Sequence, residues 1–312
     1  MNIVKKINRS YFPLLPDVKI GAGFRGLGRG GYINVISVLL LCSMSVFGQT
    51  EEVAKSKLLS VNDMFSVSQL QVVDNYLSPS TYAGAALGFE HATLSLLRAD
   101  KPQWLKMSSI MGRGAALYNE QRSASMLFAQ GAYRWGLNYQ YDIMPQFRLL
   151  AGGFAELDFA FKNVARNVNN PVNVDLSTNL HAMAWAIYRL HVGRRVVNVN
   201  LQCNAPLLGA MFVPQQGGTY YEMFSLWNLR NTLHFSSLHN KQGASAALFV
   251  DFDLKRTSWR IGVDAKSVVH TANNHYFRQQ TLGAFVGFNY QLHAFSGRNT
   301  PPAGNYAKAI VW

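Results

Sequence analysis

The sequence has very little cysteine, with two residues in 312. Cys42 falls within an apolar segment near the N-terminus, which leaves Cys203 as the one cysteine in the rest of the chain. A disulfide framework needs pairs of cysteines, and a thiolate metal site needs several at short spacing, so the sequence excludes both. Cys203 lies on the apolar side of an alternating stretch, where we expect it to behave as a small hydrophobic residue.

Charge and long apolar runs are also scarce. Charged residues make up 14% of the chain, compared with about 25% in typical soluble domains. After the first 50 positions no run of 18 apolar residues occurs, which argues against a bundle of membrane-spanning helices. The formal net charge is +13, but the basic residues are scattered, whereas a nucleic-acid-binding protein gathers them on one face. We therefore expect no nucleic-acid partner.

The common catalytic motifs are missing as well. The sequence contains no Gly-x-Ser-x-Gly elbow, no His-Glu-x-x-His pair and no phosphate-binding loop. We therefore predict no catalytic residue, no metal ligand and no cofactor. One short region brings serine and histidine together, with His234, Ser236, Ser237 and His239. An outer-membrane lipid or lipid A hydrolase would need such a pair at its lipid-facing rim, and this class stays open as an alternative.

The strongest positive signal is the stretch 147–162. Its odd-numbered positions are all apolar or small, and its even-numbered positions include the charged residues Arg148, Glu156, Asp158 and Lys162. Side chains alternate across a strand, so one face is apolar and the other is charged. The stretch is 16 residues long, whereas a typical strand has about 5–6. This pattern is typical of a barrel wall with lipid outside and a polar lumen inside.

Similar alternation recurs along the chain. It covers residues 127–141, 176–192, 197–205, 244–254, 259–266 and 282–293, and in a weaker form 104–118. In 82–98 the apolar face changes sides near residues 90–92, which predicts a bulge or tight turn between two short strands. We therefore predict an all-β fold, an antiparallel transmembrane β-barrel of about ten strands (range eight to twelve) over residues 81–295. Side chains nearly fill a barrel of that size, which argues against a general diffusion porin.

The lengths of the connections predict an orientation, because periplasmic turns are short and extracellular loops are longer. We assign the short connections to the periplasmic side, at residues 142–146, 193–195 and 255–258. We assign the longer ones to the extracellular side, at residues 163–175, 214–242 and 270–275.

The N-terminal residues 1–48 have the pattern of a secretory signal peptide. A basic, glycine-rich segment precedes an apolar run at 33–47, and small residues follow it. Such a signal predicts export, and together with the barrel pattern it leads us to expect the protein in the outer membrane. A lipoprotein signal would need a small residue before Cys42, and Leu41 is not small, so we do not expect Cys42 to carry lipid.

Two further segments carry no clear strand pattern. Residues 49–80 are interpreted as a periplasmic lead-in, in which 55–71 shows loose helical spacing of its apolar residues. A short segment inside the lumen is the alternative for 55–71. Residues 296–312 form a C-terminal tail or a short final strand, since Tyr306, Ile310 and Trp312 alternate.

The polar faces of the strands collect charged residues of both signs. We predict a lumen polar cluster of Arg148, Glu156, Asp158, His181, Arg189, Asp251, Asp253, Arg260 and Asp264. Charges inside a narrow barrel need partners, so we interpret the cluster as structural, with a catalytic or binding site as the alternative. Asp251 and Asp253 lie about 7 Å apart on one face, and we expect Arg260 or Lys266 to pair with them in preference to a metal ion.

One predicted loop is unusually aromatic. Residues 217–227 include Tyr220, Tyr221 and Trp227. Such a group of rings can bind a glycan or a protein, pack as a lid over the barrel mouth, or anchor the loop at the membrane interface. All three interpretations stay open.

Four short motifs resemble an uncharacterised Bacteroidota-type family of outer-membrane β-barrels. They are Ser-Val-Phe-Gly-Gln at the end of the signal segment, residues 75–84, Gly-Phe-Glu-His at 88–91 and Gly-Thr-Tyr-Tyr-Glu at 218–222. The resemblance covers roughly residues 74–295. It implies a barrel fold and an outer-membrane location, and it transfers no catalytic residue.

An outer-membrane barrel also implies partners. We expect outer-membrane lipid around the wall and the barrel assembly machinery during insertion, while the sequence names no ligand. Besides a structural, binding or narrow transport role, two alternatives remain: the lipid hydrolase above and a soluble periplasmic β-barrel or sandwich that binds a ligand. In the soluble alternative the apolar faces would pack inward.

Overall fold

A computed structural model describes residues 58–98, 101–168, 170–193, 195–215, 218–227, 229–254 and 257–293. No helix in these ranges is long and apolar enough to cross a membrane. The elements are β1 (Leu58–Asp74), β2 (Ser78–Arg98), β3 (Lys101–Asn119), β4 (Ser125–Met144), β5 (Phe147–Asn163), β6 (Val172–Val192), β7 (Arg195–Phe212), α2 (Tyr220–Phe224), β8 (Leu233–Ser237), β9 (Lys241–Leu254), β10 (Thr257–Ala272) and β11 (His275–His293).

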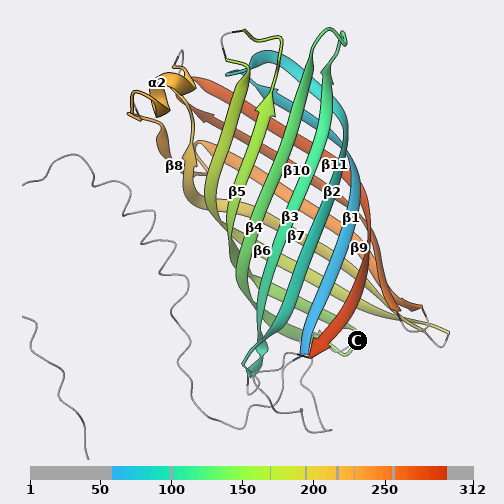
Figure 1. Cartoon of the computed structure of the whole chain (residues 1–312). Coiled ribbons are helices and arrows are strands. Elements are labelled where there is room, and N and C mark those ends of the chain that lie inside the picture. Colours follow the sequence, from blue (N-terminus) through green and yellow to red (C-terminus); the bar gives the residue numbers. More distant parts are fainter. Residues whose placement is uncertain are drawn as a thin grey trace, which may run out of the picture. The chain divides into compact units, whose positions relative to one another are not determined.

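The strands form one antiparallel sheet that closes on itself (Figure 1). Its order is β6-β5-β4-β3-β2-β1-β11-β10-β9-β7, and β7 pairs back to β6. The short β8 pairs only with the end of β7, at Leu208–Phe212. Within the described ranges, ten strands therefore make up the closed wall, which confirms the predicted ten-stranded antiparallel barrel.

The two faces of the wall differ as the alternation predicts. On β5, Leu157 and Phe159 are 53% and 47% exposed, whereas Glu156 and Lys162 are buried. Large exposed apolar side chains occur on every strand of the wall, so its outer surface is apolar and its lumen holds the charges. The soluble alternative required these apolar faces to point inward. They point outward, as a transmembrane barrel needs.

The two ends of the barrel differ in their connections. The connections after β2, β4, β6 and β9 are two residues long each, and we call this end the short-turn end. At the opposite, long-loop end the connections are 75–77, 120–124, 164–171, 213–232 and 273–274. The predicted loop at 270–275 shrinks to Asn273 and Asn274, which both have positive φ, of 52° and 62°. A two-residue hairpin turn takes that conformation, and asparagine tolerates it.

Two predictions about the first strands are wrong. Residues 58–74 are the barrel strand β1 and not part of a periplasmic lead-in. Residues 82–98 belong to one continuous strand, β2, and not to two short ones. Both predictions failed for the same reason, which is that some side chains facing the lumen are apolar. These side chains are Leu70 and Val72 on β1 and Leu94 and Leu96 on β2. The predictions for residues 1–48 and 296–312 lie outside the described residues.

The lumen is layered along its axis. A long-loop cluster of buried apolar residues includes Leu70, Phe128 and Phe277. A short-turn cluster includes Leu94, Leu150, Trp185 and Phe249. Each cluster takes side chains from strands on opposite sides of the barrel, such as β5 and β11 in the long-loop cluster and β3 and β9 in the short-turn cluster. The side chains of each cluster therefore pack across the lumen. Some charged side chains lie at the level of these clusters, since Lys162 lies against Phe277 and Arg260 against Phe249.

Candidate functional site

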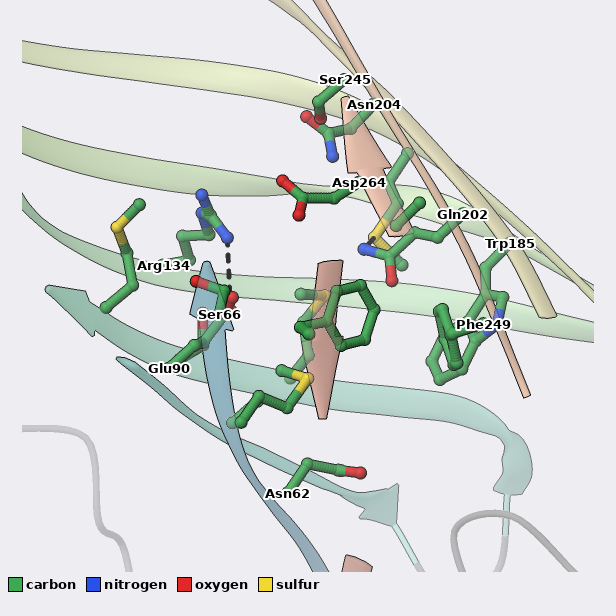
Figure 2. Close-up of a pocket in the computed structure, with 18 of the residues that line it drawn as sticks. Asn62, Ser66, Glu90, Arg134, Trp185, Gln202, Asn204, Ser245, Phe249 and Asp264 are labelled. Atoms are coloured by element: carbon green, nitrogen blue, oxygen red, sulfur yellow. Dashed lines mark hydrogen bonds and ion pairs between the residues drawn. The ribbon is translucent and has the colours of Figure 1, made fainter. Parts of the chain in front are cut away.

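A cavity of about 200 Å³ lies in the lumen and is lined by side chains from all ten strands of the wall. Figure 2 shows its two sides: Arg134 and Glu90 lie together on one side, Trp185 and Phe249 on the other, and Asp264 lies between them. The Trp185 and Phe249 rings are 6.0 Å apart between centroids. The cavity therefore offers charged groups and an apolar surface to the same small volume.

Arg134 on β4 links three strands beside this cavity. Its Nε donates to Glu156 Oε2 on β5 at 2.8 Å, and its Nη1 donates to Glu90 Oε1 on β2 at 3.3 Å. On the other side of Glu156, His181 Nε2 lies 3.4 Å from Oε1, and the His181 ring stacks on Phe154 at 4.6 Å. Glu156 is 5% exposed, so these partners offset the cost of burying its charge.

A smaller cavity of about 50 Å³ lies nearer the long-loop end, and Lys266 lines both cavities. Lys241 Nζ donates to Ser177 Oγ at 3.0 Å, and Gln130 Nε2 donates to Asp158 Oδ2 at 2.7 Å. In the described part of the chain, Lys241, Lys266 and Asp264 make no ion pair within 4.0 Å. Within this part of the chain the lumen therefore holds charged groups without a close ion-pair partner as well as paired ones.

Asp251 and Arg260 form a paired group, of which Arg260 also lines the larger cavity. Arg260 Nε and Nη2 donate to Asp251 Oδ1 and Oδ2 at 2.7 and 2.9 Å. The amides of Asn200 and Asn289 donate to the same carboxylate at 3.2 and 2.9 Å. The Arg260 guanidinium also lies 4.1 Å from the centre of the Phe249 ring. A carboxylate with four donors is a structural link between the strands.

The remaining predicted lumen residues lie at the short-turn end. Arg148 Nε donates to Asp142 Oδ1 at 2.5 Å, the backbone N–H of Arg189 donates to Gln146 O at 2.8 Å, and Asp253 is exposed. The nine predicted residues thus do not form one cluster. Glu156, Asp158, His181 and Asp264 lie at mid-lumen, Asp251 and Arg260 form their own pair, and Arg148, Arg189 and Asp253 lie at the mouth.

The long-loop end is closed by a buried charge network. Lys162 Nζ on β5 contacts Asp74 Oδ2 on β1, and it lies 2.6 Å from Asp175 Oδ2 on β6. Asn173 Nδ2 donates to Asp74 Oδ2 at 2.7 Å. The ammonium group also lies 4.3 Å from the centre of the Phe277 ring. Lys162 is 0% exposed, so the network is packed inside the lumen below the loops.

The helix α2 is hydrogen-bonded to this network. Tyr220 Oη donates to Asn173 Oδ1 at 2.7 Å and accepts from the Val174 N–H at 2.6 Å. Tyr76 Oη donates to Gly218 O at 2.9 Å. Burial raises the pKa of Tyr76 to about 12, and burial also raises the pKa of Tyr220. The helix has the capping box of Thr219 and Glu222 at its start.

The aromatic loop residues divide between two environments. Tyr220 packs inward beside the long-loop cluster, whereas Tyr221 is 67% and Trp227 is 73% exposed. Tyr220 therefore belongs to the lid of the barrel. Tyr221 and Trp227 face outward, where binding or anchoring stays a prediction.

Several charged lumen residues were not predicted from the sequence: Asp74, Glu90, Arg113, Asp175 and Lys241. Asp74 lies in the segment interpreted as a lead-in, and Arg113 lies between two glycines that weaken the alternation of β3. Extending the strict alternation of β6 and β9 toward their starts would have found Asp175 and Lys241. Among the described residues no three His, Cys, Asp or Glu side chains are grouped as a metal site.

The closed sheet, the apolar outer surface and the filled, charged lumen define a transmembrane β-barrel of the outer-membrane type. The chain belongs to the family described as protein of unknown function (DUF3316), whose model matches residues 34–299. This match confirms the predicted membership of a barrel family without an assigned activity. No curated protein matches the sequence.

Solved structures with a similar fold are outer-membrane proteins. The transport unit of the autotransporter AIDA-I from Escherichia coli is 8% identical, with a TM-score of 0.37, and the match covers 84% of this chain and 97% of that one. The outer-membrane protease OmpT from E. coli is 6% identical, with a TM-score of 0.37 and coverage of 78% and 99%. Ail, the attachment invasion locus protein of Yersinia pestis, is 9% identical, with a TM-score of 0.27 and coverage of 74% and 98%. At these scores the barrel assignment rests on the strand pairing and not on the matches.

Proposed function

We propose that this protein is an exported outer-membrane barrel that holds a small molecule in its lumen and has no open diffusion path. The predicted signal peptide at 1–48 would direct export, and the short-turn end would face the periplasm. The difference in connection length between the two ends supports this orientation.

The observation that carries the proposal is the lumen cavity beside the short-turn cluster, which contributes Leu94, Phe154, Met183, Trp185 and Phe249 to its lining. It has about 200 Å³ and contacts with ten strands. For comparison, an apolar cavity of about 150 Å³ in another protein binds benzene. A molecule with a short apolar body and one polar group fits the mixed lining, since its body would contact Trp185 and Phe249 and its polar group would reach Lys266 or Asp264.

The first experiment tests location and closure. Outer membranes from cells that express the full chain are analysed on SDS gels with and without boiling, and we expect a mobility shift on boiling. The purified protein in planar bilayers should then show no stable conductance. A steady open-channel current would contradict the closed lumen.

The second experiment tests the ligand. Hexanoate and hexylamine are titrated against the detergent-solubilised protein while the thermal unfolding midpoint is recorded, because a ligand that binds the folded state raises that midpoint. One of the two should raise the midpoint for the natural protein but not for Ala247→Phe, since Ala247 lines the cavity and a phenyl group there fills it. If neither probe raises it, or if both proteins respond alike, the cavity is not the binding site.

A further inference from the structure

Three polar side chains meet on the outer surface of the barrel wall, where lipid is expected. Asp63 lies on β1, His91 on β2 and Tyr290 on β11. Asp63 Oδ1 lies 2.6 Å from His91 Nδ1, and Tyr290 Oη donates to Asp63 Oδ2 at 2.6 Å. All three point outward, because they share their faces with the exposed residues Phe65, Phe89 and Phe288. They lie apart from the lumen cavity.

The group lies near the short-turn end, at the level of a belt of aromatic residues. Lipid-facing rings near this end include Trp104, Tyr139, Tyr141, Trp259, Phe288 and Tyr290. Such a belt marks the membrane interface. Asp63 pairs with Phe288 in the β1–β11 register, so its carboxylate lies at the depth where the ester groups of lipids meet water.

A carboxylate on the lipid-facing surface is unfavourable unless something specific holds it. Here both of its oxygen atoms are engaged, one by His91 and one by Tyr290. The contact with Asp63 fixes the imidazole tautomer that carries its proton on Nδ1, which leaves Nε2 as a base. In the described ranges Nε2 makes no hydrogen bond, and the His91 side chain is 41% exposed. The arrangement is that of an oriented general base.

Hydrogen-bond donors lie beside this base on the same surface. Thr93 on β2 follows His91 by two residues and pairs directly with Ser108 on β3. Among the described residues, Thr93 Oγ1 and Ser108 Oγ make only long contacts of 3.4 Å, to Ser108 O and Tyr133 Oη. Both hydroxyl groups are therefore available to donate to the carbonyl oxygen of an ester held against His91.

We propose that Asp63 and His91 form the base of an esterase that hydrolyses an acyl ester of a membrane lipid at the outer surface of the barrel. His91 is the catalytic residue, and Asp63 and Tyr290 are positioning residues. This function is independent of the lumen ligand.

The reaction uses water as the second substrate. His91 Nε2 takes a proton from a water molecule as the water oxygen forms a bond to the ester carbonyl carbon. The hydroxyl groups of Thr93 and Ser108 stabilise the resulting oxyanion. The bond between the carbonyl carbon and the alcohol oxygen then breaks, and the proton on Nε2 passes to the leaving oxygen. The products are a fatty acid and a lipid with one acyl chain fewer, and no electrons are exchanged.

The test is lipid hydrolysis by the full-length protein in vesicles of phosphatidylethanolamine and phosphatidylglycerol, with released fatty acid measured by mass spectrometry. We expect the natural protein to release fatty acid and His91→Gln to lose roughly 100-fold or more of that rate, as removal of a general base does. Asp63→Asn, which keeps the shape but favours the wrong tautomer, should lose a similar factor. Tyr290→Phe should lose only a few-fold, about 3–10-fold.

The matched control is another exposed, hydrogen-bonded histidine, His239, whose Nδ1 lies 2.6 Å from Ser237 Oγ. Its variant His239→Gln should hydrolyse lipid at the natural rate, and all variants should keep the mobility shift on boiling that reports a closed barrel. Added imidazole should restore part of the activity to His91→Ala but none to Asp63→Asn. The proposal is overturned if the natural protein releases no fatty acid, if His91→Gln is as active as the natural protein, or if His239→Gln removes the activity instead.

Discussion

Lys162 on β5 and Asp74 on β1 form an ion pair through the lumen, although β2, β3 and β4 separate their strands in the wall. The pair therefore ties together two sides of the barrel that share no backbone hydrogen bonds. Asp175 and Phe277 complete the surroundings of the ammonium group. The ion pair therefore connects β1 and β5 through the long-loop end of the lumen.

Removing that ammonium group should destabilise the barrel. Lys162→Met leaves Asp74 and Asp175 close together with no cation between them, and breaking a buried pair in this way costs about 3–5 kcal/mol. The free energy of unfolding in urea, measured in phospholipid vesicles, should fall by about that amount. Adding Asp74→Asn to Lys162→Met should recover part of the loss. The exposed Lys101 supplies the control, since Lys101→Met should change the free energy by less than about 0.5 kcal/mol.

The hydroxyl group of Tyr220 should hold the lid closed. Tyr220→Phe leaves the Val174 N–H and the Asn173 amide oxygen without this partner, and each unsatisfied group costs about 1–3 kcal/mol. The loop should then detach more often, and trypsin should cleave after the exposed Arg230 about tenfold faster or more, because the rate follows the population of the open form. The exposed Tyr221 gives the matched variant, Tyr221→Phe, which should be cleaved at the natural rate. Equal rates for both variants would mean that the lid does not depend on this hydroxyl group.

Alkaline conditions should open the same lid. The pKa of Tyr76 is raised from 10.0 to about 12 in the closed lid. Once the loop detaches, water reaches the phenol and its pKa returns toward 10.0. The detached form therefore loses a proton at lower pH than the closed form, so the closed form loses stability as the pH rises from about 10 to about 12.

Cleavage by an alkaline-stable protease should report this opening as a faster rate across that pH range. Tyr76→Phe has no proton to lose, so its rate should depend less on pH in the same range. A natural protein whose cleavage rate stays flat from pH 9 to pH 12 would contradict the assignment of Tyr76 to the closed lid.

The depth of a side chain in the membrane should decide the cost of a charge on the outer face. Leu157 lies near the middle of β5 and is 53% exposed, whereas Leu190 lies two residues from the short-turn end of β6 and is 38% exposed. An arginine at the bilayer midplane costs about 2–4 kcal/mol, and near the interface about 0–1. Urea unfolding in vesicles should therefore show Leu157→Arg to be much less stable than Leu190→Arg. If both variants lose the same free energy of unfolding, Leu157 does not lie closer to the bilayer midplane than Leu190.

The sequence predicts the strands of the wall best where many of their lumen-facing side chains are polar. On β4 and β5 polar or charged residues fill half of the inward positions and the outward ones are apolar, so the period of two is plain, and the predicted ranges 127–141 and 147–162 end within three residues of the strand ends. On β7 four amide side chains alternate with outward apolar residues, but the predicted range 197–205 stops seven residues before Phe212.

On β1 the inward Leu70 and Val72 belong to the long-loop cluster, while the neighbouring Gln69 and Gln71 are polar and exposed. On the second half of β2 the inward Leu94 and Leu96 belong to the short-turn cluster and alternate with Thr93 and Ser95. The contrast between an apolar outer face and a polar inner face is locally reversed there, and β1 was missed.

The sites were less predictable than the wall, because they depend on contacts between strands that are distant in the sequence. Alternation places Lys162 in the lumen, but nothing local to it identifies Asp74 as its partner. The contact between Asp63 and His91 depends on the β1–β2 register, and Asp63 lies in a strand that the pattern did not reveal. Whether the charged lumen residues are only structural stays a prediction.

The pairing of β1 with β11 has a consequence for how the molecule reaches its native state. These strands are the first and last of the described wall, and they pair along their whole length, from Leu58 with His293 to Asp74 with Phe277. The contact that completes the wall therefore joins residues about as far apart in the chain as any in the barrel, and such long-range closure is slow. Until it forms, two strand edges expose backbone groups that a hydrocarbon environment does not tolerate. Insertion should consequently be all-or-none, so a chain that ends before β11 should have no stable membrane-embedded form.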